Sequence, residues 1–239
     1  MRVSILFSLL TGSEALLQGH SNGYRMRHPV SLQMGLTLYG SQGSRSPLVN
    51  WAAYELNLPL DMGNLAVNPH PFGQIPSLTD GDDVVVFESG AILLYLNGLK
   101  NQKLTPSQEG QILSWVTWAN ASLDPICFLE TPEGKVYDTG LKKPNRRMDN
   151  LDEILSKQEY LIPNEFTVAD VAVSSYLLYV LQFFPGVSLA RWPHIVKYLQ
   201  RCATRESYGK AFGKNVQSYL AQSLSDMTPE KPNKLFGMF

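Results

Sequence analysis

The sequence has little of several features that mark large classes of protein. Of its 239 residues only two are cysteine, Cys127 and Cys202, which excludes a disulfide framework of the small secreted kind and favours a reducing compartment. No apolar run approaches the ~20 residues that a membrane-spanning helix needs. The 20 basic and 21 acidic side chains nearly cancel, so no strong field attracts nucleic acid or an acidic membrane. The composition predicts a compact globular protein that binds neither nucleic acid nor an acidic membrane.

Motifs for metals and phosphates are scarce as well. The histidines at positions 20, 28, 70 and 194 and the two cysteines lie too far apart for the usual spacing of metal ligands. The sequence has no Walker loop and no Gly-x-Gly-x-x-Gly segment, and Gly40-x-x-Gly43 is better explained as a plain turn. We therefore expect no metal ion.

Residues 1–33 differ in character from the rest of the chain. Arg2, the short apolar run 3–10 and the small residues after it form a thin secretory-type signal. Arg25 and Arg27, with no acidic residue after Glu14, also suit a transit peptide. The alternative is an unstructured extension that contains no targeting signal. We expect the folded part to begin at Met34.

Residues 34–99 have the pattern of a small α/β domain. Alternation over 36–39 predicts a strand, and apolar residues at helical spacing over 46–56 predict a helix with Pro47 in its first turn. A hairpin is expected over 77–87 around the turn 80–83, followed by a helix from Glu88 to Leu96. Residues 61–67 form only a short connection, and the three prolines within 68–76 indicate a stiff loop.

Residues 104–225 contain helical patterns, and strand signals disappear after Leu99. Helices are expected over 105–120, 144–157, 193–205 and 209–220, and another begins near 166. This last helix is apolar on nearly all sides, which predicts a central position. Thr167 and Asp170 can form a reciprocal capping box, with Phe166 packed on Val171. Residues 226–239 form a tail, so a helical domain follows the α/β domain.

Three short segments could together bind a small anionic peptide. The Ile75-Pro76 bond is one that can be cis, which would leave the amide and carbonyl of Ile75 free to pair with an extended ligand. Glu88-Ser89 at a helix N-terminus offers a hydroxyl, an amide and the positive helix end, which suit a carboxylate. Ser44 offers a hydroxyl at the start of the first helix. Ordinary capping and turn roles are the alternative.

Four segments of the sequence resemble the glutathione transferase superfamily. They are residues 38–46 (LYGSQGSRS), 68–78 (NPHPFGQIPSL), 87–92 (FESGAI) and 166–170 (FTVAD), and the resemblance extends from Met34 to about Phe212. The second and third segments most resemble the serine-type phi and theta-like classes. The resemblance implies a thioredoxin-like N-terminal domain, an all-α helical-bundle C-terminal domain, a role in detoxification and a homodimer.

The resemblance also implies roles for individual residues. Ser44 matches the serine that donates a hydrogen bond to the glutathione sulfur, with Ser46 as the alternative. A hydroxyl donor and a helix N-terminus favour the thiolate of a group whose pKa is ordinarily about 8.5. The matching glutathione-binding positions are Gln74, Ile75, Pro76, Glu88 and Ser89. Trp115, Trp118 and Phe128 could border the pocket of the second substrate, core packing being the alternative.

Two departures from the family pattern concern glutathione binding. The family has a helix before its Asn-Pro loop that contacts the glycine carboxylate, whereas residues 61–67 are too few for one. His70 could supply that contact instead. The arginine that commonly follows Glu-Ser is Gly90 here.

The expected function is therefore glutathione-dependent transfer to small hydrophobic electrophiles, in the cytoplasm or, through residues 1–33, in a plastid or other organelle. The expected partners are glutathione, an electrophile and a second copy of the chain. A non-catalytic interaction or scaffold module is the alternative. Glutathione-dependent redox chemistry is a third hypothesis, which would require a cysteine in place of Ser44 or Arg45.

Overall fold

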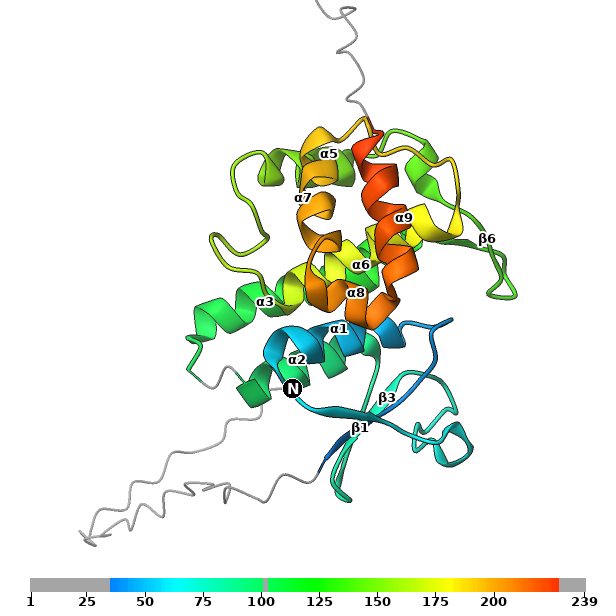
Figure 1. Ribbon diagram of the computed structural model, residues 1–239, viewed down its shortest axis with the longest axis vertical. Coiled ribbons are helices and arrows are strands. Elements are labelled where there is room, and N and C mark those ends of the chain that lie inside the picture. Colours follow the sequence, from blue (N-terminus) through cyan, green and yellow to red (C-terminus); the bar gives the residue numbers. More distant parts are fainter. Residues whose placement is uncertain (1–34, 101–102, 228–239) are drawn as a thin grey trace, which may run out of the picture. The chain divides into compact units, whose positions relative to one another are not determined.

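The computed structural model describes residues 35–100 and 103–227 (Figure 1). The predictions for residues 1–33 and for nearly all of the tail 226–239 lie outside these residues. Within the described residues, no helix combines the length and the apolar character that crossing a membrane requires.

The first domain contains a mixed four-stranded sheet in the order β2-β1-β3-β4. Strand β1 (Leu36–Tyr39) pairs parallel with β2 (Leu60–Met62) and antiparallel with β3 (Ser77–Asp80), which forms the predicted hairpin with β4 (Val84–Phe87). The sequence predicted no strand at β2. Three residues, two of them exposed, are too few to show a period of two.

Two helices lie between this sheet and the second domain (Figure 1). Helix α1 (Ser46–Leu56) has a proline in its first turn, as predicted, and Asn57 forms its C-cap. Helix α2 (Ser89–Lys100) begins one residue later and ends four residues later than predicted. As expected, no helix joins β2 to β3, where the chain forms a 3-10 turn at Leu65–Val67 and then the proline-rich loop.

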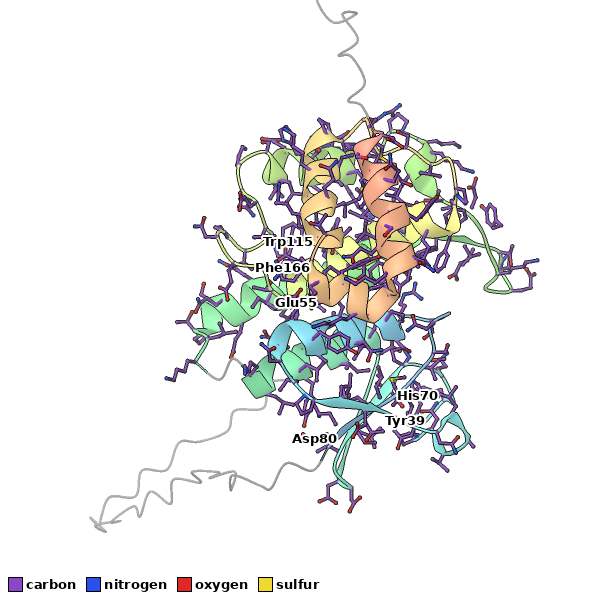
Figure 2. The ribbon with its side chains drawn as sticks, in the orientation of Figure 1. Tyr39, Glu55, His70, Asp80, Trp115 and Phe166 are labelled. Carbon is purple, nitrogen blue, oxygen red and sulfur yellow. The ribbon has the colours of Figure 1, made fainter. Side chains whose placement is uncertain are left out.

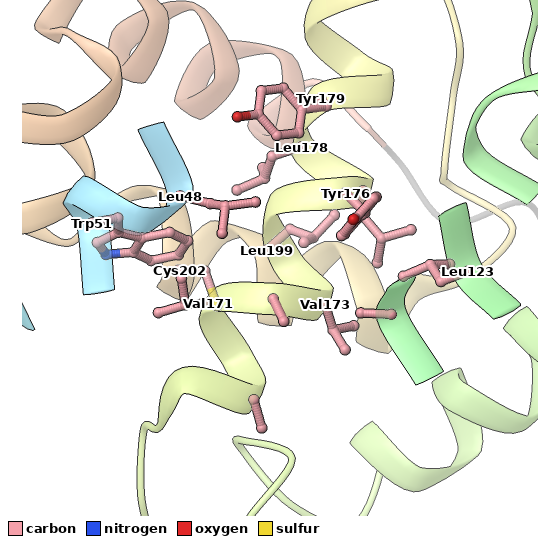
Figure 3. Close-up of a cluster of buried hydrophobic side chains, with 14 of the residues drawn as sticks. Leu48, Trp51, Leu123, Val171, Val173, Tyr176, Leu178, Tyr179, Leu199 and Cys202 are labelled. Atoms are coloured by element: carbon pink, nitrogen blue, oxygen red, sulfur yellow. The ribbon is translucent and has the colours of Figure 1, made fainter. Parts of the chain in front are cut away.

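The second domain contains the helices α3 (Pro106–Trp118), α4 (Asp124–Cys127), α5 (Arg146–Leu155), α6 (Val168–Phe183), α7 (Pro193–Ala203), α8 (Glu206–Phe212) and α9 (Lys214–Ser225). A π-helical turn at Ala119–Leu123 ends α3 earlier than predicted. Helix α6 is central, as its apolar sequence predicts, because side chains on all its sides are buried. Leu48 and Trp51 of α1 pack with Val171 and Leu178 of α6 in one core (Figure 3).

Two predictions for this domain were wrong. A hairpin of β5 (Leu129–Glu130) and β6 (Val136–Asp138) lies where no strand was expected, because both strands are too short to show a pattern. The single helix predicted over 209–220 is two helices, α8 and α9. The chain turns between them at Gly213, whose φ of 94° is rarely adopted by other residues.

The predicted capping box at the start of α6 is confirmed. The Thr167 side chain caps the helix, and the buried Asp170 carboxylate accepts hydrogen bonds at 2.9 Å from the amides of Thr167 and Leu161. Phe166 also makes contacts beyond the predicted one with Val171, which stays a prediction. Its ring centroid lies 5.6 Å from that of Trp51 and 3.9 Å from the Arg205 guanidinium carbon, so it joins the helical domain to α1.

Candidate active site

The register of the sheet brings the predicted binding segments to one end. Tyr39, the last residue of β1, pairs with Ser77 of β3, which pairs with Phe87 of β4. The loop after β1, the Ile75-Pro76 bond before β3 and the Glu88-Ser89 pair after β4 therefore share this end. Figure 2 shows Tyr39 and His70 here and Asp80 at the opposite end.

The loop before β3 is held by its own polar groups. The side-chain nitrogen of Asn68 donates to the Gln74 backbone carbonyl at 2.8 Å, and the side-chain oxygen of Asn68 accepts from the Ser77 hydroxyl at 2.6 Å. The Ile75-Pro76 bond, which the sequence showed could be cis, is cis. Gln74 is exposed.

Glu88 and Ser89 form the junction between β4 and α2. Glu88 has a φ of 67°, a left-handed conformation that is unusual for this residue type and is often found at functional sites. Its carbonyl accepts the first helical bond, from the amide of Ile92 at 3.0 Å. Ser89 is buried, with its hydroxyl 3.4 Å from the side-chain oxygen of Asn120.

Asn120 also explains why residue 90 is glycine, where the family resemblance suggests arginine. A Cβ atom added at Gly90 would lie 2.5 Å from the Asn120 amide nitrogen and 3.2 Å from a methyl carbon of Val116. Asn120 is held in place by a 2.8 Å bond to the Val116 carbonyl and accepts from the Tyr176 hydroxyl at 2.8 Å. A larger residue at position 90 would therefore have to push aside the Asn120 side chain.

Ser44 lies in the loop between β1 and α1, which we call the serine loop (residues 40–46). Its hydroxyl oxygen is 2.8 Å from the Ser41 carbonyl and 2.7 Å from the Ser46 hydroxyl, and it accepts from the Ser46 amide at 3.1 Å. Ser44 is half-buried, whereas Ser46 is only 1% exposed. Of the two serines, Ser44 is the one that a ligand could contact without movement of the loop, and its role stays a prediction.

A cavity of about 400 Å³ lies next to Ser44, between the serine loop, the end of α6 and the β5–β6 hairpin. Of the three aromatic residues suggested by the sequence, only Phe128 lines this cavity. Trp115 and Trp118 line a different cavity between α3 and α5. The residues around the cavity at Ser44 are Gly43, Ser44, Arg45, Phe128, Glu130, Val136, Tyr179, Phe183 and Phe184.

Sequence reasoning missed the residues that α6 and the hairpin contribute to this cavity. Tyr179 and Phe183 are four residues apart, which places them on one side of α6, and their rings stack with centroids 5.4 Å apart. This spacing was visible in the sequence, but it could not be distinguished from core packing. Glu130 and Val136 could not be found, because the hairpin itself was not predicted.

Arg45 ties the serine loop to the helical domain. Its guanidinium forms an ion pair with Asp124 and lies 5.0 Å from the ring centroid of Tyr176 and 5.5 Å from that of Phe128. Burial alone would lower the pKa of Arg45, but its interactions with Tyr176 and Asp124 outweigh burial and raise that pKa. Arg45 is therefore a permanent cation at the wall of the cavity.

Tyr179 supplies a second tie between the two domains at this point. Its hydroxyl donates to the backbone carbonyl of Ser44 at 3.1 Å. Because Tyr179 is buried and also packs against Phe212, with centroids 5.6 Å apart, it holds the position of Ser44 from the helical side.

His70 lies near Phe87 rather than free in the loop. It is buried, its ring centroid is 4.9 Å from that of Phe87, and its Nδ1 accepts from the amide of Phe72 at 3.0 Å. Only Nε2 is left to contact a ligand, so a bond to the glycine carboxylate stays a prediction.

Cysteines and metal ligands do not contribute to this site. Cys127 and Cys202 are both unpaired and buried, and burial raises the pKa of each thiol. Among residues 35–100 and 103–227, no group of three or more histidine, cysteine, aspartate or glutamate side chains could hold a metal ion.

Comparison with known proteins agrees with this arrangement of domains. Residues 34–98 match the family model of the glutathione S-transferase N-terminal domain, and residues 115–206 match that of the C-terminal domain. A glutathione S-transferase domain-containing protein of Dictyostelium discoideum is 28% identical over 188 residues, covering 71% of this chain and 70% of the relative. Glutathione S-transferase PM239X14 of Arabidopsis thaliana is 34% identical over 147 residues, covering 54% of this chain and 67% of the relative.

Solved structures show the same fold. The theta class glutathione S-transferase of Xanthomonas axonopodis pv. citri, solved with glutathione bound, has a TM-score of 0.59 at 22% identity and covers 74% of this chain and 97% of its own. Glutathione S-transferase-I, bound with lactoylglutathione, has a TM-score of 0.60 at 26% identity, and the match covers 74% of this chain and 98% of that structure's chain. With a thioredoxin-like domain followed by a helical domain, and with family models that together match more than half of its length, the chain belongs to the glutathione S-transferase superfamily.

Proposed function

We propose that this chain is a glutathione transferase in which the Ser44 hydroxyl holds the glutathione thiolate for attack on a small hydrophobic electrophile. The observation that carries the proposal is the position of Ser44. It lies at the sheet end shared by Ile75-Pro76 and Glu88-Ser89, and it also lines the aromatic cavity. A peptide thiol bound at the sheet end would therefore meet an apolar acceptor at Ser44.

Each binding segment fits one part of glutathione. The backbone of Ile75, just before β3, can pair with the extended cysteinyl unit, with Pro76 and Gln74 beside it. Ser89 and the first amides of α2 can hold the γ-glutamyl carboxylate, because a helix N-terminus favours an anion. A glutathione-bound theta class structure among the neighbours supports the same ligand.

The reaction itself needs a thiolate and a dry acceptor pocket. The Ser44 hydroxyl would donate to the sulfur and, with the start of α1 and the Arg45 cation, lower the pKa of the thiol. The thiol proton passes to solvent, and a sulfur lone pair forms the new bond to the electrophilic carbon. In a substitution, the leaving group departs with its bonding electrons. In an addition to an activated alkene, the π electrons move to the neighbouring carbon, which takes a proton from water.

The proposal includes a homodimer working in detoxification in the cytoplasm. An apolar groove on α2 and α3, lined by Ala91, Leu94 and Val116, and the exposed side chain of Phe72 offer surfaces that a second copy could cover. The buried cysteines give no support to the redox hypothesis, because neither lines the cavity.

The test is conjugation of glutathione to an activated aryl chloride, with Ser44→Ala as the comparison. We expect the substitution to lower kcat at least tenfold, about 1.4 kcal/mol of barrier, with little change in glutathione affinity. An unchanged rate would remove Ser44 from the mechanism. If calorimetry of the wild-type chain detects no binding at several millimolar glutathione, the non-catalytic interaction module becomes the better explanation.

A further inference from the structure

Ser46 is a buried residue that is hydrogen-bonded to Ser44. It begins α1, is 1% exposed and does not line the cavity, yet its hydroxyl oxygen lies 2.7 Å from that of Ser44. Either oxygen could be the donor on distance alone. The direction of this bond follows from counting hydrogens and acceptors in the serine loop.

Each hydroxyl has one hydrogen to donate. Among the described residues, the only acceptor bonded to the Ser46 hydroxyl is Ser44 Oγ, since its other close group, the Ser41 amide at 3.1 Å, is itself a donor. Ser44 Oγ has a second acceptor, the Ser41 carbonyl at 2.8 Å. Both hydrogens are therefore bonded only when Ser46 donates to Ser44 and Ser44 donates to Ser41.

This direction determines what Ser44 can do chemically. Its oxygen accepts from both the Ser46 hydroxyl and the Ser46 amide, at 2.7 and 3.1 Å, so both lone pairs are occupied. Ser44 then has no lone pair left to take the proton of a thiol and can act only as a donor. When this hydrogen turns toward a sulfur in the cavity, the Ser41 carbonyl still accepts a hydrogen bond from the Ser44 backbone amide, at 3.2 Å.

We propose that Ser46 is a positioning residue, which directs the Ser44 hydrogen toward the glutathione sulfur and strengthens it as a donor. The hydrogen bonds run in one direction, from the Ser41 amide to Ser46, from Ser46 to Ser44 and from Ser44 to the sulfur. Such chains polarise each member and strengthen the last donor. This proposal rests on the proposed function of Ser44.

Gly40 explains how Ser46 reaches this position. A Cβ atom at residue 40 would lie 1.9 Å from Ser46 Oγ and 2.5 Å from Ser46 Cβ. The bond between the two hydroxyls therefore depends on a residue without a side chain at position 40. Gly40→Ala offers a way to displace the Ser46 hydroxyl while leaving both serines in the sequence.

The test compares pH–rate profiles of the whole wild-type chain, Ser46→Ala, Ser44→Ala and the double variant, with glutathione and an uncharged aryl chloride. With glutathione saturating, we expect Ser46→Ala to lower kcat/KM for the aryl chloride about threefold at pH values below the pKa of the bound thiol. At pH values above that pKa the variant should match the wild type. In the Ser44→Ala background the same change should have no effect, because Ser46 acts through Ser44.

Two further variants separate this role from a loss of packing. Ser174→Ala also truncates a buried serine, whose hydroxyl donates to the Asp170 carbonyl at 2.6 Å away from the cavity, and it should leave the pH profile unchanged. Gly40→Ala should reproduce the profile of Ser46→Ala. If Ser46→Ala does not fold, the Gly40→Ala profile decides between the two roles.

Three outcomes would overturn the proposal. A loss that is equal at every pH, or one that persists in the Ser44→Ala background, would make Ser46 a structural residue only. A displaced thiol pKa in Ser44→Ala but not in Ser46→Ala or Gly40→Ala would remove the relay and leave the proposed function intact. Full activity of Ser44→Ala would instead overturn the role of Ser44 itself.

Discussion

Ser89 has a hydroxyl that must serve two partners if glutathione binds as proposed. In the free protein it donates to Asn120 over 3.4 Å, a long bond that a carboxylate at the start of α2 can replace. Asn120 keeps its second donor, the Tyr176 hydroxyl at 2.8 Å, when Ser89 turns away. The side chain can therefore change partners without leaving a buried group unpaired.

Ser89→Ala should consequently weaken glutathione binding without slowing the chemical step. A hydrogen bond to a charged group contributes about 1.5–3 kcal/mol, which corresponds to a rise of about tenfold or more in KM for glutathione. Initial rates over a range of glutathione concentrations measure the effect, with kcat expected to stay within a factor of two. A variant with normal KM would show that the carboxylate binds elsewhere.

At the residue scale, the candidate binding residues could be found from sequence because each lies next to a strand end or helix start. The register of the sheet places Ser44, Ile75 and Ser89 at one end of it. The acceptor cavity could not be found in this way. Its wall includes Tyr179 and Phe183, whose positions depend on how α6 crosses the first domain rather than on local pattern.

At the scale of elements, α2 contains two glycines in opposite surroundings. Gly90 faces Asn120, whereas Gly98 is exposed and an added Cβ there would meet nothing within 4 Å. Gly90→Ala should destabilise the protein by about 1–2 kcal/mol, because the new methyl group overpacks the contact with α3. Gly98→Ala is the matched control and should stabilise it by about 0.5–1 kcal/mol.

Thermal unfolding of these two variants beside the wild type measures both effects. Opposite shifts in Tm are expected, downward for Gly90→Ala and upward for Gly98→Ala. Equal shifts would mean that the close approach of the Asn120 side chain does not limit the size of the residue at position 90.

The start of α6 offers a second test at this scale. Thr167→Ala removes the side chain that caps the helix and should cost about 1 kcal/mol of unfolding free energy. Urea unfolding measures the loss, and an unchanged midpoint would mean that the bonds of Asp170 to the amides of Thr167 and Leu161 are sufficient without the cap. Thr204→Ala, at an exposed helix end, is a suitable control.

Elements with a clear local signal could be predicted, and those without one could not. Helix α6 has both a capping box and a long apolar stretch, and its capping residues Thr167 and Asp170 were predicted. Strands β2, β5 and β6 have two or three residues each and exist through their pairing partners. The break between α8 and α9 depends on Gly213, whose φ is not visible from composition alone.

At the scale of the whole molecule, the two domains are joined by a polar cluster around Glu55 of α1. Arg205 donates to both carboxylate oxygens at 2.6 Å, Trp51 donates to one of them at 3.0 Å, and Ser207 also bonds to it. Burial alone would raise the pKa of Glu55, but the bonds from Arg205, Ser207 and Trp51 outweigh burial and lower that pKa.

A carboxylate with a lowered pKa in the folded state stabilises that state above its unfolded pKa, and this contribution is lost as the pH falls. Glu55→Gln should therefore be about 1.5–3 kcal/mol less stable than the wild type at pH 7. The difference should shrink as the pH drops below about 4.5, where the carboxyl of the unfolded chain becomes protonated. Urea midpoints at a series of pH values measure it.

A constant difference between Glu55→Gln and the wild type at all pH values would show that the ionised carboxylate is not what joins the domains. Glu153→Gln is the matched control, because Glu153 forms an exposed pair with Lys157 in one helical turn. Exposed pairs of this kind contribute little to stability, so this variant should follow the wild type closely.

The most direct test of thiol activation is a spectroscopic pH titration of glutathione bound to the whole chain, with Ser44→Ala as the comparison. In the wild type, the bound thiol should ionise at least about one pKa unit below its ordinary value of about 8.5. Ser44→Ala should raise this pKa again by most of the difference, because only the start of α1 and the Arg45 cation then remain to lower it. A bound thiol that ionises at its ordinary pKa in the wild type would contradict thiol activation by Ser44.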